Sequence, residues 1–233
     1  MKKILWIVVL GLFLNGNAYA LPSCKGEDYT KWTNCVGTYT NDKGRKFTGE
    51  FGNDPGKRHG KGISVNKKGL KFEGEFKNDK IYKGTLYSSK IILEGKFKNG
   101  KLHGIGVATF KNLGIVEKGQ WKNGLKHGYI EVNDKEGFTY KGHYKENKMH
   151  GYGVLEFQEK FDRGYAKYSS QFRNGNPISG ILETKEGKYI GELKNWVPHG
   201  KGKQILSDGK IYRGIFENGS YKGKILLPSL FKN

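Results

Sequence analysis

A pentapeptide with a large, usually aromatic residue at each end and, in seven of its eight copies, a glycine at its centre constrains the fold more strongly than any other feature. Its centres are residues 49, 74, 95, 119, 142, 170, 191 and 214, so the repeat is 21 to 28 residues long. Such a period is typical of repeat proteins, whose small units stack and bury a shared face. Ends and centre lie at i, i+2 and i+4, which places them on one face of a β-strand.

Each pentapeptide is followed by the signals of a hairpin. Asn-Gly occurs at 99–100, 123–124, 174–175 and 218–219, with Asn53-Asp54 and Asn78-Asp79 as variants. These residues tolerate the positive φ that a two-residue hairpin turn requires. A His-Gly pair, a second apolar run such as 105–110 or 203–206, and another glycine turn then follow. Each unit is therefore predicted to form strand, tight turn, strand and turn.

The composition supports a β fold. Glycine makes up 36 of 233 residues, and each interior glycine costs a helix about 1 kcal/mol, which argues against long helices. Aromatic residues make up 13% of the chain, too many for a disordered chain with a net charge of +20. A single hairpin is marginal in water, whereas stacked hairpins stabilise one another. The sequence predicts an all-β fold: an array of about eight stacked antiparallel hairpins with an aromatic column along it.

Residues 1–20 have the pattern of a signal peptide. Lys2 and Lys3 precede an apolar run over residues 4–14, and small residues flank Tyr19. An uncleaved anchor is the alternative, but eleven residues reach only ~16 Å as a helix, about half a bilayer core. Removing the two lysines leaves a charge of 40 − 22 = +18. No later apolar run is long enough to span a membrane, so we expect an exported protein of the periplasm, the cell envelope or the medium.

Cys24 and Cys35, the two cysteines of the chain, follow directly. In an oxidising compartment such a pair most simply forms a disulfide. Lipidation of Cys24 is the alternative, because Leu21-Pro22-Ser23-Cys24 loosely resembles a lipobox. The proline disfavours that interpretation, and Cys35 would lose its partner.

The succession Tyr-x-Gly-x-aromatic-x-x-Gly-x-x-His-Gly-x-Gly resembles the MORN repeat over residues 35–224. The resemblance implies an elongated, twisted row of antiparallel hairpins. The two cysteines and the Gly-Thr-Tyr-Thr of residues 37–40 are similar to the N-terminal cap of secreted bacterial members. MORN repeats are associated with protein scaffolding and with phospholipid headgroups, so the resemblance implies a binding platform.

Together these patterns predict a signal peptide (1–20), a disulfide-linked cap (21–46), repeats (47–224) and a capping tail (225–233). Three units depart from the pattern. The second has Tyr82 at the histidine position, the sixth has Ser170 and Ile178 in place of Gly and His, and the eighth is truncated. We expect the second and sixth to be local bends or insertions. The eighth unit should end the array, with residues 226–231 covering it.

The histidines do not predict a metal site. Five of the six occupy one position of the repeat: His59, His103, His127, His150 and His199. Successive hairpins lie about 10 Å apart, because each adds two strands at ~4.8 Å, so the imidazoles cannot share an ion. We expect a structural column that hydrogen-bonds neighbouring turns, with His143 at an outward position.

No catalytic motif is present, and the protein is predicted not to be an enzyme and to need no cofactor. The chain lacks a Gly-x-Ser-x-Gly elbow, a Walker sequence and a His-Glu-x-x-His motif. Glu50, Glu75 and Glu192 share one position but belong to separate units. A hydrolase acting on envelope polymers, which would need two converging carboxylates, is the least favoured function.

A basic residue follows the second large residue of the pentapeptide in six consecutive units. This basic ladder consists of Lys77, Lys98, Lys122, Lys145, Arg173 and Lys194. Stacking places its steps about 10 Å apart, pointing away from the aromatic face. The alternative is that these side chains only promote solubility and deter aggregation, with Glu75 and Glu192 neutralising part of the charge.

Two functions follow from these features. The first is a protein–protein scaffold that binds its partner in a groove on the aromatic face. This aromatic groove would consist of Phe51, Phe76, Phe97, Trp121, Tyr144, Phe172 and Phe216. The second is binding of anionic lipid headgroups or envelope polysaccharide through the basic ladder. Nucleic acid is a weak candidate, because the aromatic residues are needed for the core and an exported protein rarely meets it.

Overall fold

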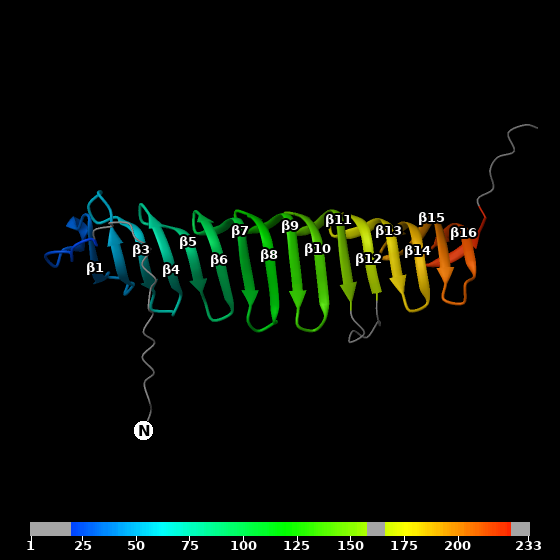
Figure 1. Ribbon diagram of the computed structural model, residues 1–233, viewed down its shortest axis with the longest axis horizontal. Helices are drawn as coiled ribbons and strands as arrows, with labels where there is room; N and C mark the ends of the chain where they lie inside the picture. The colour runs from blue at the N-terminus through cyan, green and yellow to red at the C-terminus, as the bar shows by residue number, and fades with distance from the viewer. Residues whose placement is uncertain (1–19, 158–165, 225–233) are drawn as a thin grey trace, which may run out of the picture.

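The strands stack in chain order into one long antiparallel sheet (Figure 1). The computed structural model describes residues 20–157 and 166–224. The predicted signal peptide, except Ala20, and the predicted tail 225–233 lie outside the described residues. The described elements are one 3-10 helix and seventeen strands: η1 (Tyr29–Lys31), β1 (Cys35–Thr40), β2 (Lys46–Phe51), β3 (Arg58–Val65), β4 (Lys71–Lys77), β5 (Lys80–Tyr87), β6 (Ile91–Lys98), β7 (Lys101–Phe110), β8 (Ile115–Lys122), β9 (Leu125–Asp134), β10 (Phe138–Lys145), β11 (Lys148–Phe157), β12 (Ala166–Arg173), β13 (Asn176–Thr184), β14 (Gly187–Lys194), β15 (Val197–Leu206), β16 (Ile211–Glu217) and β17 (Ser220–Gly223).

The predicted array of eight hairpins is confirmed. Strands β2 to β17 pair two by two, from the first hairpin, β2–β3, to the eighth, β16–β17, and each hairpin also pairs with the next. Described connections between hairpins lie along the lower edge of the row in Figure 1, while the hairpin tips lie along the upper edge. The array therefore has two edges of different character.

Glycines from neighbouring strands lie opposite one another along most of the sheet, from β1 to β16. The register places one residue from each of β1 to β16 in this glycine row, and the two that are not glycine are Ile130 and Ser170. The others are Gly37, Gly49, Gly62, Gly74, Gly84, Gly95, Gly106, Gly119, Gly142, Gly153, Gly180, Gly191, Gly202 and Gly214.

Aromatic rings lie directly on the glycine row. A Cβ on Gly62 would stand 2.5 Å from the ring of Phe47, and one on Gly153 would stand 2.3 Å from the Tyr140 hydroxyl oxygen. The Phe47 ring meets the ring of Phe51 edge-on at 5.6 Å and the ring of Phe76, in the next hairpin, at 5.1 Å. These contacts form the predicted aromatic column, and the glycines make room for it.

The Tyr140 phenol shows how a polar group is accommodated in the column. Its hydroxyl donates a hydrogen bond to the carbonyl of His143 at 3.1 Å. Burial raises the pKa of the phenol far above its ordinary value, so the hydroxyl keeps the proton that it donates.

The prediction of an open aromatic groove is wrong. Its seven side chains are only 1% to 8% exposed: Phe51, Phe76, Phe97, Trp121, Tyr144, Phe172 and Phe216. The physical reason is that these side chains belong to one buried cluster, in which they pack against rings and apolar side chains of their own and adjacent hairpins. The column is the hydrophobic core, and Trp121 and Tyr144 are not available to a partner.

The fourth hairpin replaces one aromatic residue of the column with an ion pair. Glu117 of β8 stands where other units have an aromatic residue or leucine, and its carboxylate binds the Lys126 ammonium of β9. The two side chains are only 11% and 15% exposed. The Lys126 ammonium also lies 4.6 Å from the centre of the Tyr144 ring. The charges are thus compensated by each other and by a ring face.

The N-terminal segment covers the first edge of the sheet. Cys24 and Cys35 form a disulfide, the pairing that the sequence favours, with Cα atoms 4.9 Å apart. The Cys24 N–H donates to the Val36 carbonyl at 2.9 Å. Trp32 is buried against Phe51, and its indole N–H donates to the Gly26 carbonyl at 3.0 Å. The end of the aromatic column is thereby shielded from water.

We predict that Gly153→Val destabilises the protein by about 1–3 kcal/mol, because the new side chain would overlap the Tyr140 ring. Chemical denaturation followed by tryptophan fluorescence measures the free energy of unfolding. Tyr152→Val, at the exposed neighbouring position of the same strand, is the control and should change stability little. Equal effects of the two substitutions would contradict the role of the glycine row.

We predict that Glu117→Ala destabilises by about 3–5 kcal/mol, because it leaves the Lys126 ammonium largely buried without its carboxylate. Glu73→Ala, which removes the exposed Lys71–Glu73 pair, should cost less than about 1 kcal/mol. Urea titrations of both variants measure the difference, and similar losses would show that the Glu117–Lys126 pair is not special.

Candidate functional site

The tips of seven of the eight hairpins are two-residue turns, and these turns determine where the basic ladder stands. In the third hairpin Asn99 has φ 50° and Gly100 has φ 73°, the two positive values of a type I′ turn. Asn78-Asp79 forms such a turn as predicted, with φ 47° and 63°. The prediction for Asn53-Asp54 is wrong: neither has a positive φ, and residues 52–57 form a longer loop.

The His-Gly pair produces a local bulge in the second strand. Between the pairs Gly142–Gly153 and Tyr144–Met149, β10 advances by two residues and β11 by four. Gly151, in the bulge, has φ 72°. The same shift occurs in all five hairpins that contain His-Gly. The second, sixth and eighth hairpins, which lack the motif, have one extra residue instead of two.

The bulge also decides how neighbouring tips are joined. After each His-Gly hairpin, a backbone N–H in the next turn donates to the carbonyl of the residue before the histidine, for example Gly124 to Leu102 at 2.8 Å. The other bonds of this kind are Asp79 to Arg58, Asn147 to Lys126, Gly175 to Met149 and Gly219 to Pro198. Among the described residues, no such bond joins the second hairpin to the third or the sixth to the seventh. We call these two junctions untied, because they lack this backbone hydrogen bond; each follows one of the two units for which the sequence predicts a local bend or insertion.

The histidines follow the bulge and differ in their partners. The Nδ1 of His59 lies 3.1 Å from the Asn78 side-chain oxygen, and the Nδ1 of His103 accepts from the Asn123 N–H at 3.4 Å. The Nδ1 atoms of His150 and His199 are buried without a hydrogen-bond partner. The expected bonds to neighbouring turns are therefore present in part of the column. Residues 20–157 and 166–224 contain no group of three or more potential metal ligands.

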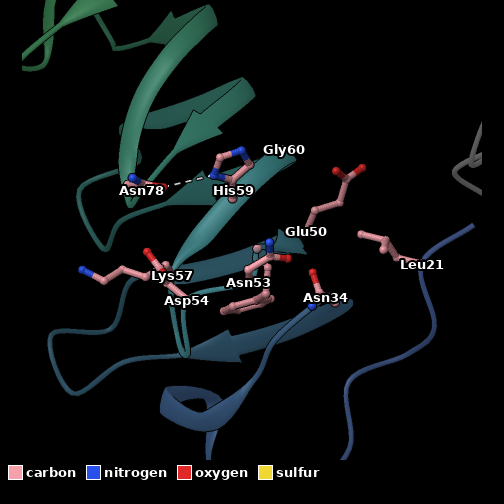
Figure 2. Close-up of a pocket in the computed structure, with 11 residues that line it drawn as sticks. Leu21, Asn34, Glu50, Asn53, Asp54, Lys57, His59, Gly60 and Asn78 are labelled. Atoms are coloured by element: carbon pink, nitrogen blue, oxygen red, sulfur yellow. Dashed lines mark hydrogen bonds between the residues drawn. The ribbon is translucent and has the colours of Figure 1, made fainter.

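The recurring glutamates cover the bulge. The Glu192 carboxylate lies over Gly200 and accepts a hydrogen bond from the Lys201 N–H at 3.3 Å, and Glu50 lies over Gly60 in the same way. Glu50 also lines a surface pocket of about 370 Å³ near the N-terminal cap. Figure 2 shows its carboxylate pointing away from His59, which is bonded to Asn78. This arrangement makes the carboxylates part of the hairpin structure.

All six side chains of the basic ladder are exposed at the tips, each as the last residue of its strand. None of them forms an ion pair with another described residue. The expected neutralisation of Lys77 by Glu75 and of Lys194 by Glu192 is therefore not present as direct contacts.

A second set of lysines, which the sequence analysis missed, stands opposite the ladder. The register pairs Lys77 with Lys80, Lys98 with Lys101 and Lys145 with Lys148. Like charges directly opposite one another are destabilising in a sheet. These lysines could have been predicted from the sequence, because a type I′ turn pairs the residue before it with the residue after it. The tips of the second, third and fifth hairpins therefore carry two cations each.

Comparison with protein families assigns the repeat. Six segments match the family described as MORN repeat: residues 56–70, 72–81, 94–114, 118–129, 140–159 and 189–211. The chain is a MORN-repeat protein. The sixth hairpin, which carries Ser170 and Ile178, lies outside the matched segments. MORN repeats are typically interaction modules, which agrees with a binding function.

A search of curated proteins found no match to this chain. Within residues 20–157 and 166–224 no helix has the length and apolar character needed to cross a bilayer.

We predict that Gly151→Ala costs about 1 kcal/mol, because alanine is strained at φ 72° although the site has room for a Cβ. Gly151→Asn should cost less, since asparagine tolerates this conformation. Thermal unfolding of the two MORN-repeat variants tests this, and an equal loss in both would mean that backbone conformation is not the reason for the glycine.

Proposed function

We propose that the protein is an exported, non-catalytic scaffold that binds an acidic segment of a partner protein along its hairpin tips. The basic ladder carries this proposal: six cationic side chains at one repeat position, all exposed and none in an ion pair with a described residue. Their charges are free to meet an acidic partner.

The repeat gives the ladder a fixed spacing. Successive hairpins stand about 10 Å apart, and hydrogen bonds between tips join the third to sixth hairpins in series. An extended acidic segment can contact several steps at once, and weak single contacts then add up to a useful affinity. Such binding should be sensitive to salt, because exposed charges are screened.

Family membership and the N-terminal disulfide support the remaining parts of the proposal. MORN repeats are typically interaction modules, which supports a non-catalytic role. Disulfides persist mainly in oxidising compartments, so the Cys24–Cys35 bond supports export to the periplasm, the envelope or the medium.

A second candidate is binding of anionic lipid headgroups or envelope polysaccharide. The lysine pairs Lys98–Lys101 and Lys145–Lys148 favour it, because two ammonium groups at one tip match a dense anionic surface or polymer.

The test uses three probes: poly-glutamate, vesicles of phosphatidylcholine with phosphatidylglycerol, and alginate. Replacing Lys122, Lys145 and Lys194 together with glutamine should weaken binding roughly tenfold or more at low salt, and raising the salt should weaken binding of the wild type. Replacing Lys68, Lys90 and Lys111, exposed lysines in connections between hairpins, is the control of equal charge.

Binding of poly-glutamate that depends on the ladder supports the scaffold. If vesicles or alginate bind through the ladder and poly-glutamate does not, the result supports the second candidate and contradicts the scaffold. No binding of any probe, or equal losses in ladder and control variants, would contradict both.

A further inference from the structure

A cleft opens at the untied junction between the second and third hairpins. Pairing of β5 with β6 ends at Lys83–Lys96, whereas at the tied junction of β7 with β8 it continues to Gly104–Trp121. The cleft lies between the two tips and has a volume of about 540 Å³, within the usual range of small-molecule sites. Residues of β4, β5, β6 and β7 line it.

Four lysines give this lysine cleft its charge: Lys77, Lys80, Lys96 and Lys98. No acidic residue lines it, and none of the four forms an ion pair with a described residue. The register places like charges opposite one another twice at this junction, because Lys77 pairs with Lys80 and Lys83 pairs with Lys96. Such pairs are unfavourable in the sheet, and a bound anion would relieve them.

The rest of the lining is suited to an organic ring. Ile81, Tyr82 and Phe97 provide apolar surface, while Asn99 and His103 add groups that can hydrogen-bond hydroxyls. The Lys77 ammonium lies 5.9 Å from the centre of the Tyr82 ring, so one charge is held beside this apolar surface. The combination calls for a ligand with a polar ring and more than one negative charge.

The junction between the sixth and seventh hairpins also lacks the backbone hydrogen bond, but there a side chain fills the space between the tips. At the turn of the seventh hairpin, Trp196 reaches back to the sixth and meets the rings of Tyr168 at 5.4 Å and Phe172 at 6.2 Å. Gly100 occupies the same turn position in the third hairpin, and a Cβ there would meet nothing within 4 Å. One junction is packed by an indole and the other is left open.

We propose that the lysine cleft binds a phosphorylated sugar. Lysine ammonium groups are suited to phosphate, and the apolar wall with its polar neighbours accepts the face and hydroxyls of a sugar ring. This site does not depend on the ladder function, because Lys80 and Lys96 are outside the ladder and the distant ladder steps are outside the cleft.

Isothermal titration calorimetry with glucose 1,6-bisphosphate tests the proposal. The wild type should bind it, glucose should not bind, and inorganic phosphate should bind roughly tenfold more weakly. Gly100→Trp should abolish binding by filling the cleft, and Trp196, at φ 69°, shows that this turn position accepts the residue. Gly124→Trp, at the same position of a tied junction, should leave binding intact.

A second pair of variants keeps the test decisive if Gly100→Trp fails to fold. Lys80→Gln with Lys96→Gln should weaken binding roughly tenfold or more, while Lys101→Gln with Lys118→Gln, an equal loss of charge outside the cleft, should not. Replacing ladder residues Lys122, Lys145 and Lys194 should also leave cleft binding unchanged. Failure of the ladder and failure of the cleft can thus be distinguished.

Phosphatidylcholine vesicles containing lipid A, a phosphorylated glycolipid, distinguish the source of the sugar. Cleft-dependent binding of the free bisphosphate points to a soluble or polymeric sugar phosphate, and binding to the vesicles alone points to a lipid-borne one. The proposal is overturned if neither probe binds, if the cleft variants bind like the wild type, or if inorganic phosphate binds as tightly as the sugar.

Discussion

The packing of aromatic rings onto a row of glycines is the contact on which the rest of the structure depends. At Gly62 and Gly153 a single additional carbon would collide with the ring that lies there. The rings of Phe47 and Tyr140 cover the backbone of their own hairpins and meet a ring of the next, Phe76 and Phe172 respectively. One set of contacts therefore builds the hairpin and joins it to its neighbour, which explains how short units without helices form one continuous core.

This packing has a direct consequence for function. Since the aromatic side chains are used in the core, the surfaces left for partners are the outer face and the two edges. At the tip edge the repeat displays cations such as Lys98 and Lys122 that no described acid binds. The surface that carries recurring cations without a described ion-pair partner is thus formed by the turns and not by the face that packs into the core.

The sequence was sufficient for the features that short-range chemistry determines. The period of the glycines, the Asn-Gly turns and strand alternation predicted the hairpins and the shared face of Phe47, Gly49 and Phe51. Alternation could not say whether that face is open, because burial of Trp121 depends on contacts made by the folded array. The lysines opposite the ladder could have been predicted from the two-residue turns, which pair the residues on either side of them. The cleft could not, because it depends on where the pairing of β5 with β6 ends, and no motif determines that position.

The two untied junctions also affect how firmly successive hairpins are connected at their tips. Hydrogen bonds between tips join the first hairpin to the second, the third through the sixth in series, and the seventh to the eighth. The row is thereby divided into blocks of two, four and two hairpins, held at the tips by the backbone within a block but not between blocks. At the second boundary, Trp196 packs against Tyr168 and Phe172 and accepts a hydrogen bond from the Tyr168 hydroxyl at 2.9 Å. Bending of the long sheet should therefore concentrate at the first boundary, beside Tyr82, where the described residues include no such contact.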